Sequence, residues 1–207
     1  MRTLEVKRIS APVQADAVGR ILDASGVKWH HIDNVNWPEE YPFQPVADFR
    51  IAHTGDSILL QYRVEEPTVR AVAATDNGRV WEDSCVEFFV ENPAGEGYIN
   101  VECNCAGNIL MACGPDRDHR TTFAVERLGA ISRQATLGRE PFDEKAAPEF
   151  WEVSLKIPAE LLCISNLSGK QLRANFYKCG DLLSTPHFLS WNSFDTHNPD
   201  FHRQKNL

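Results

Sequence analysis

The feature that most constrains the fold is a pair of alternating segments separated by one tight turn. Segment 84–90, SCVEFFV, is apolar at every second position, and segment 98–105, YINVECNC, repeats this pattern after the turn residues NPAGEG. Successive side chains of a β-strand point to opposite faces, so this period predicts a hairpin with one apolar face. The opposite face would carry Glu87, Asn100 and Glu102.

Short runs of the same kind, bounded by turn residues, recur along the chain. They read DFRIAH, ILLQYRV, VRAVAAT, ILMAC, TFAVERL, AISRQAT, FWEVSLKI, QLRANFYKC and HFLSW. Helices are expected only at residues 13–24, where Val13, Ala17 and Ile21 share one side, and at PAELLC, residues 158–163. We therefore expect an all-β protein, an antiparallel two-layer β-sandwich of the immunoglobulin or jelly-roll kind with one or two short helices.

The length predicts the domain organisation. A chain of 207 residues can bury one sizeable core, and β-sandwiches of this length are commonly single domains. We expect one domain over residues 1–207. Within it, residues 1–45 should form a partly irregular N-terminal segment packed on the sandwich, because Pro38, Pro42 and Pro45 interrupt any regular element there.

The charge distribution limits the classes of ligand and partner that the chain can bind. Acidic residues outnumber basic ones by 29 to 21, and no stripe of Lys and Arg is present, which disfavours nucleic acid and favours a neutral or cationic ligand. No run approaches the roughly 18 apolar residues that a membrane span needs. As written, the chain shows no signal peptide, so we expect a cytoplasmic protein, or a periplasmic or secreted one if a signal sequence has been removed.

The polar face of the predicted hairpin is the first candidate for a site. Asn175 and Tyr177, in RANFYKC, would extend it onto a third strand beside Glu87, Asn100 and Glu102. Such a face can hold a polyhydroxylated ligand, because carboxylates and amides pair with adjacent hydroxyls. It can equally be the solvated side of an antiparallel sheet.

Metal binding is a further possibility. Asp76, Glu82 and Asp83 lie on predicted loops and could bind calcium through their oxygens, although an ordinary acidic turn has the same composition. The six cysteines are scattered without zinc-site spacing, so most should be buried thiols: Cys85, Cys103, Cys105, Cys113, Cys163 and Cys179.

Several motifs resemble the family 9 carbohydrate-binding modules and their free-standing bacterial relatives, which are DOMON-like β-sandwiches. The matching stretches are VWEDSCVEFFVE from Val80, GYINVECNCAGN from Gly97, ANFYKCGD from Ala174, HFLSW from His187 and NPDFH from Asn198. The resemblance implies a non-catalytic module that binds terminal sugars of cellulose-type or xylan-type glycans, holding a sugar ring between two aromatic side chains.

The resemblance also implies roles for individual residues. Trp81 corresponds to the first aromatic platform, and Glu87 and Asn100 correspond to polar contacts. Glu102 stands where the sugar-binding module carries an arginine. The second platform falls on Phe201, close to Asn198, or in another alignment on Trp191.

Three other function classes remain open, and one of them is a purely structural or interaction domain, which the absence of a pocket beside Trp81 would favour. A glycosidase acting on O-glycosyl bonds would need a pair of carboxylates, for which Glu87 and Glu102 are the candidates. A DOMON-like cofactor binder, for example of haem through a histidine and a methionine, would have only Met1 and Met111 to use.

Overall fold

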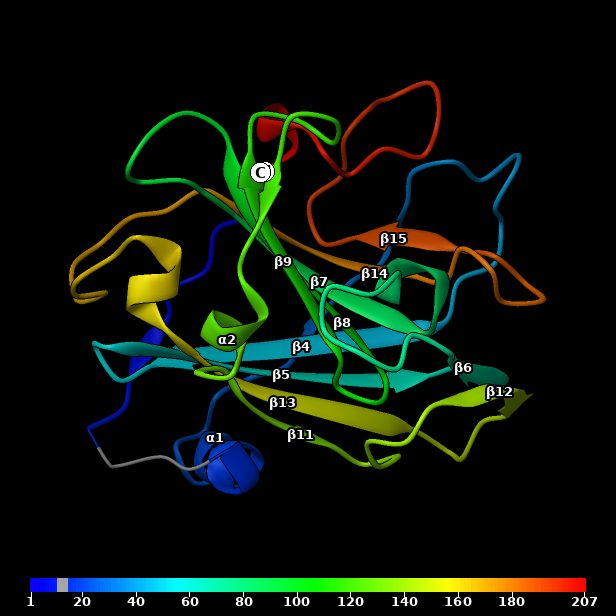
Figure 1. The fold of residues 1–207 in the computed structure, drawn as a ribbon, viewed down its shortest axis with the longest axis horizontal. Coiled ribbons are helices and arrows are strands. Elements are labelled where there is room, and N and C mark those ends of the chain that lie inside the picture. The colour runs from blue at the N-terminus through cyan, green and yellow to red at the C-terminus, as the bar shows by residue number, and fades with distance from the viewer. Residues whose placement is uncertain (11–14) are drawn as a thin grey trace.

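The computed structural model describes residues 1–10 and 15–207 and confirms an all-β sandwich with two short helices (Figure 1). The first sheet has the order β1-β4-β5-β13-β11, with β2 also paired to β4. Its strands are β1 (Lys7–Arg8), β2 (His30–His31), β4 (Val46–His53), β5 (Ser57–Glu65), β11 (Ser132–Ala135) and β13 (Trp151–Pro158). All of its pairings are antiparallel except that of β1 with β4.

The second sheet carries the candidate site and has the order β10-β9-β8-β7-β14-β15-β3. Its strands are β3 (Asn34–Val35), β7 (Cys85–Glu91), β8 (Tyr98–Asn104), β9 (Ile109–Gly114), β10 (Thr121–Thr122), β14 (Ala174–Cys179) and β15 (Phe188–Ser190). The predicted hairpin is present, because β7 and β8 pair over their whole length. A separate two-stranded ribbon joins β6 (Thr68–Ala71) to β12 (Phe142–Ala146).

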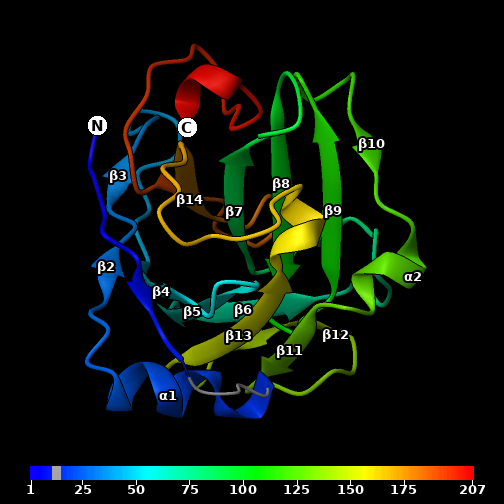
Figure 2. The ribbon, with the colours of Figure 1, turned by 90° about the vertical axis from the view of Figure 1, so that its left-hand side faces the viewer.

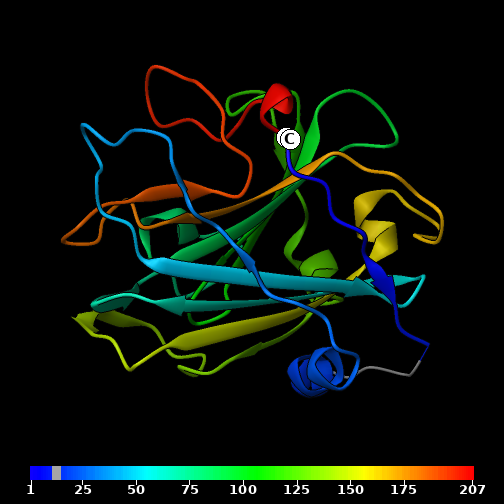
Figure 3. The same ribbon diagram turned by 180° about the vertical axis from the view of Figure 1, so that it is seen from behind.

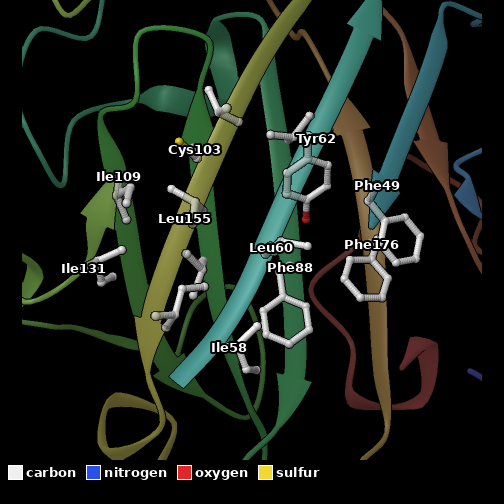
Figure 4. Packing of buried hydrophobic residues seen from close by; sticks show 14 of the residues in the cluster. Phe49, Ile58, Leu60, Tyr62, Phe88, Cys103, Ile109, Ile131, Leu155 and Phe176 are labelled. Atoms are coloured by element: carbon white, nitrogen blue, oxygen red, sulfur yellow. The ribbon is translucent and has the colours of Figure 1, made fainter. Parts of the chain in front are cut away.

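The core lies between the two large sheets, which form separate layers when the molecule is seen from the side (Figure 2). Phe49 of β4 stacks on Phe176 of β14, with ring centroids 3.7 Å apart. Tyr62 of β5 donates a hydrogen bond to the backbone oxygen of Glu87 at 2.8 Å. Figure 4 shows these side chains with Leu60, Phe88 and Leu155 filling the space between the layers. The apolar alternation therefore fixes which face of β7 looks inward.

The helices depart from the expectation in detail. The first consists of η1 (Ala15–Ala17) and α1 (Val18–Ala24), which ends before Gly26, a residue with a φ of 65°. Val13 lies outside the described residues. The expected helix at 158–163 is the 3-10 helix η3 (Ala159–Leu162).

One predicted strand is wrong. TFAVERL forms β10 at its start and then the helix α2 (Val125–Leu128), from which Leu128 alone is buried. Four residues with one buried side chain are too few for a periodic signal of either kind to decide.

The N-terminal residues run along one side of the sandwich, beside β4 (Figure 3). The C-terminal residues, including η4 (Gln204–Asn206), lie against the second sheet on the side away from the core. This placement decides how the polar face of the second sheet is exposed.

Candidate functional site

A row of polar side chains crosses three strands of the second sheet on its outer face. Tyr177 of β14 is paired in register with Glu87 of β7, and Glu87 is paired with Glu102 of β8. Asn100 lies two residues from Glu102 and therefore on the same face. We call these four residues the polar row. Sequence alternation predicted that they share a face, and the structure brings them together.

The polar row is buried, although it faces away from the core. None of its four residues is more than 2% exposed. The alternative interpretation, a solvated outer face, is therefore wrong, because the C-terminal segment covers the sheet there. Phe201 stacks on Tyr177 with ring centroids 4.3 Å apart, and Trp37 and Phe194 pack around Phe201.

Asn175 anchors this cover. Its amide nitrogen donates to the backbone oxygens of Asn192 and Asn206, at 3.0 and 2.8 Å. Its amide oxygen accepts from the backbone nitrogen of Asn192 at 2.8 Å. These contacts occupy both ends of the amide, so Asn175 holds the C-terminal segment rather than offering a free group to a ligand.

Each member of the polar row has one side-chain atom without a hydrogen-bond partner. Among the described residues, six buried side-chain atoms lack a partner, and four of them are Glu87 Oε2, Asn100 Oδ1, Glu102 Oε2 and the Tyr177 hydroxyl. Burying a polar atom without a partner costs on the order of 1–3 kcal/mol, so such atoms are rare in folded proteins. Their concentration on adjacent strands indicates groups that need a partner from outside the chain, such as a ligand or an ordered water molecule.

The remaining atoms of the two glutamates are held by neighbours. The Cys179 thiol donates to Glu87 Oε1 at 3.2 Å. Glu102 Oε1 accepts from Asn100 Nδ2 and from Arg120 Nη1, both at 3.0 Å. Burial is the main cause that raises the pKa of Glu87 well above its usual value, and burial also raises the pKa of Glu102.

Trp81 and Asp181 lie beyond the same end of β7 and β14. Trp81 belongs to the 3-10 helix η2 (Val80–Glu82), is only half-buried, and accepts a hydrogen bond at its backbone oxygen from the Asp181 nitrogen at 3.2 Å. Burial raises the pKa of Asp181 to about 6. Asp181, Arg120 and Cys179 are not among the site residues that the sequence predicts. Asp181 could have been found, because it follows the third polar strand directly.

A surface cavity of about 670 Å³ lies beside the polar row, between residues 115–118 and 197–205. Asn198 and His202 line this cavity, and Asn198 is exposed. The His202 ring reaches from the cavity wall to the Tyr98 hydroxyl at 3.0 Å and to Glu102 at 3.9 Å. Asn198 thus lies on the outer side of the cover, and Phe201 forms its inner side.

Trp191 is a core residue. Its ring packs edge-on against Phe49 and Phe176, each at 5.6 Å between centroids, in the space between the sheets. Trp191 is therefore on the opposite side of the second sheet from the polar row. The alternative alignment that made it a sugar platform is not compatible with this position.

The three carboxylates considered for calcium do not converge. Asp83 accepts from the backbone nitrogens of Val72 and Ala73 and from Arg70 and Asn104. Asp76 pairs with Arg133 at 2.6 Å, and Glu82 pairs with Arg79 at 2.5 Å. Each carboxylate meets a different set of protein donors, which leaves no shared oxygen cage of the kind that calcium prefers.

Within the described residues, one group could offer a metal three ligand atoms lying within 4.8 Å of one another: Cys85, Glu87 and Cys179. Burial raises the pKa of the Cys85 thiol to about 12, and that of Cys179 is also raised, so both thiols are protonated. The group is a hydrogen-bonded set next to the polar row. All six cysteines are free, and four of them are buried.

The positions of the two methionines do not suit haem binding by a histidine and a methionine. Met111 is buried in the core between the sheets, and Met1 is 86% exposed. In the part of the chain that the structure describes, no helix is both long and apolar enough to cross a membrane.

Comparison with known proteins bears on this site. The sequence pattern described as carbohydrate-binding family 9 matches residues 16–207. A crystal structure of a Bacteroides uniformis protein that has been proposed to bind carbohydrate is 45% identical, with a TM-score of 0.92 over 98% of this chain and 95% of that one.

Two more distant structures share the fold. A family 9 module from Caldicellulosiruptor kristjanssonii in complex with glucose is 16% identical, with a TM-score of 0.55 over 90% of this chain and 83% of that one. Its complex with cellotriose is 15% identical, with a TM-score of 0.52 over 90% and 82%. No curated protein matches the chain.

Proposed function

Because the chain belongs to carbohydrate-binding family 9, we propose that it binds a saccharide at the polar row, with Trp81 as the stacking surface at the rim. The observation that carries the proposal is the set of four unpartnered polar atoms on three adjacent strands. Sugar hydroxyls act as both donors and acceptors and could satisfy these atoms in pairs. The flat apolar side of a pyranose ring could pack on the indole.

The side chains around the polar row determine from which side a sugar would reach it. Trp81, Asp181 and Arg120 are less buried than the polar row. Trp81 and Asp181 lie beyond the end of β7 nearest to Glu87, and the Arg120 side chain reaches Glu102. We infer that the non-reducing or reducing end of a glycan binds here, since Phe201 stacks on Tyr177 and His202 contacts Tyr98, and these two covering residues leave little room for an internal sugar residue. The ligands of the Caldicellulosiruptor kristjanssonii module, glucose and cellotriose, support a glucose-type end residue of a cellulose-type glycan. A xylose-type end residue of xylan is the other part of the proposal, and calorimetry with glucose and xylose distinguishes the two.

The proposal is for binding without hydrolysis. A glycosidase remains the second candidate, because Glu87 and Glu102 are directly opposite each other and the pKa of each is raised. Hydrolysis requires one carboxyl to stay protonated while the other is ionised. The family to which the chain belongs is one of carbohydrate-binding modules, which favours binding over catalysis.

Isothermal titration calorimetry with glucose, xylose, cellobiose and xylobiose tests the proposal. The wild-type protein should bind at least one of these sugars, and Trp81→Ala should abolish that binding while circular dichroism remains unchanged. Trp29→Ala is the matched control, because Trp29 lies on the first sheet beneath Arg50 and Arg63. Equal binding by wild type and Trp81→Ala would refute the role of Trp81.

Product analysis separates the two candidates. Prolonged incubation with cello-oligosaccharides and xylo-oligosaccharides, followed by chromatography, should leave the sugars intact. Shorter products that disappear in Glu87→Gln would replace the binding proposal with the glycosidase.

A further inference from the structure

We infer that the polar row selects saccharides that carry a free amine, with the sugar ammonium held between Glu87, Glu102 and Tyr177. This inference rests on the proposed function, since it names the class of sugar for the same site. It follows from which atoms lack partners and from the charges that surround them.

The unpartnered atoms are mainly acceptors. When the two carboxyls are ionised, Glu87 Oε2, Asn100 Oδ1 and Glu102 Oε2 are all acceptors, and only the Tyr177 hydroxyl can also donate. A sugar hydroxyl has one hydrogen to donate, whereas an ammonium group has three. One ammonium group could therefore satisfy three acceptors of the polar row at once.

The positions of these acceptors suit a single small group. Glu87 and Glu102 are directly opposite on neighbouring strands, and Tyr177 is directly opposite Glu87 on its other side. Side chains in such cross-strand pairs lie about 5 Å apart at Cβ. Three strands therefore present their polar ends to one narrow region of the outer face.

Carboxyl groups in this region outnumber the cations that contact them. The carboxyls are Glu87, Glu102 and Asp181, and Arg120 is the cation that contacts them directly, through Glu102. Arg117 acts from farther away and is itself paired with Asp200 at 3.2 Å. An ionised carboxylate buried without a counter-charge is costly, so a cationic ligand would be favoured.

The other titratable groups that face the row do not supply the missing charge. Burial lowers the pKa of His202 to about 2, so its imidazole is neutral. The thiols of Cys85 and Cys179 are protonated, and burial raises the pKa of the Tyr98 hydroxyl. Lys178 faces the opposite side of the sheet, where its ammonium pairs with Glu66 at 3.0 Å.

A neutral sugar and an amino sugar would depend on pH in different ways. Without a cationic ligand, the Glu87 and Glu102 carboxyls can stay protonated and therefore uncharged. A neutral sugar hydroxyl can bind to them in that state. An ammonium group needs ionised carboxylates, so its binding should weaken as the pH falls and the carboxyls become protonated.

Calorimetry with D-glucosamine, D-glucose and N-acetyl-D-glucosamine at pH 6.5 tests the inference, because amines of this kind titrate at about 7.7–8.0. We expect D-glucosamine to bind at least about tenfold more tightly than D-glucose, as a charge-assisted hydrogen bond exceeds a neutral one. N-acetyl-D-glucosamine lacks the charge and should lose this advantage. The D-glucosamine preference should also decrease between pH 6.5 and pH 4.5.

Two variants test whether the preference for D-glucosamine comes from the polar row. Glu102→Gln and Glu87→Gln should each reduce the preference for D-glucosamine over D-glucose to about twofold or less, while Glu65→Gln, an exposed residue of β5, should keep it. Using both variants guards against one of them failing to fold. If D-glucose binds as tightly as D-glucosamine, the inference is overturned and the proposed function stands. If none of these three sugars binds but xylose, cellobiose or xylobiose does, the inference alone is overturned. If no sugar of either set binds, both are overturned.

Discussion

Glu87 and Glu102 stand directly opposite each other on β7 and β8, and each is held through one carboxylate oxygen while the other oxygen lacks a partner. The two side chains are therefore fixed in place by Cys179 and Arg120 before any ligand arrives. Such preorganisation reduces the ordering cost of binding.

Asp181 should make stability depend on pH. Its carboxyl has a pKa raised from 3.8 to about 6, so ionisation is less favourable in the folded protein than in the unfolded chain. The cost is absent below pH 3.8 and complete above about pH 6. Asp181→Asn should therefore stabilise the protein by about 2 kcal/mol at pH 8, after allowance for partial exposure, and by almost nothing at pH 3.

Urea denaturation of both proteins at pH 3, 5 and 8 would measure this difference. A gain that is the same at all three values would show that Asp181 acts through packing rather than through its charge.

Asp83 should be a structural residue. Its buried carboxylate accepts from Arg70, Asn104 and two backbone nitrogens, so Asp83→Ala would leave several buried donors without partners. We expect a loss of about 3 kcal/mol or more in the free energy of unfolding. Glu82→Gln, at the neighbouring position, should change it by less than about 1 kcal/mol. Calcium should not raise the melting temperature, and a rise of several degrees would restore the calcium prediction.

The buried ion group at the end of the sandwich gives a third prediction. Lys178 Nζ lies 3.0 Å from Glu66 Oε2 and 2.7 Å from His187 Nε2, and the side chains of all three residues are fully buried. Lys178→Met would leave Glu66 buried without a cation and should cost about 3–5 kcal/mol. The double variant Glu66→Gln with Lys178→Met should recover part of this loss. Equal stability of the single and double variants would contradict a charge effect.

Trp191 and Trp81 should respond in opposite ways to the same substitution. Trp191→Ala removes a core side chain and should lower the free energy of unfolding by about 3–5 kcal/mol. Trp81→Ala should cost much less, since Trp81 is half-buried at the rim. Saccharide binding should be retained by folded Trp191→Ala at low temperature. Denaturation measures the stability of both variants, and calorimetry measures their saccharide binding. A large loss of stability in Trp81→Ala together with a loss of binding in Trp191→Ala would contradict the assignment of Trp191 to the core and Trp81 to the sugar.

Much of the fold could be predicted because alternation is a local property. The pattern at 84–105 fixed both the hairpin and the faces of Glu87, Asn100 and Glu102. The same rule applied to HFLSW would place Trp191 on the inward face with Leu189, as the structure has it. The error over Trp191 arose from considering a resemblance in place of the alternation.

The burial of the polar row could not be predicted in this way. It depends on hydrogen bonds between Asn175 and the backbone of residues 192 and 206, which have no periodic pattern. The contribution of Arg120 likewise comes from a loop, whose position depends on distant contacts. Sequence alternation assigns a residue to a face of a sheet, but it does not reveal what covers that face.

The order of strands has a consequence for folding kinetics. β7 and β8 are joined by a short turn. However, β14, which pairs with β7 and supplies Tyr177, comes much later in the chain. In the same way, β5 pairs with the much later strand β13. Pairings between distant segments must overcome loop-closure entropy first, so they form slowly. During synthesis, the hairpin would expose the edge of β7 until β14 arrives. The polar residues that face outward from β7 and β8 would then make this intermediate less prone to aggregate than an apolar edge.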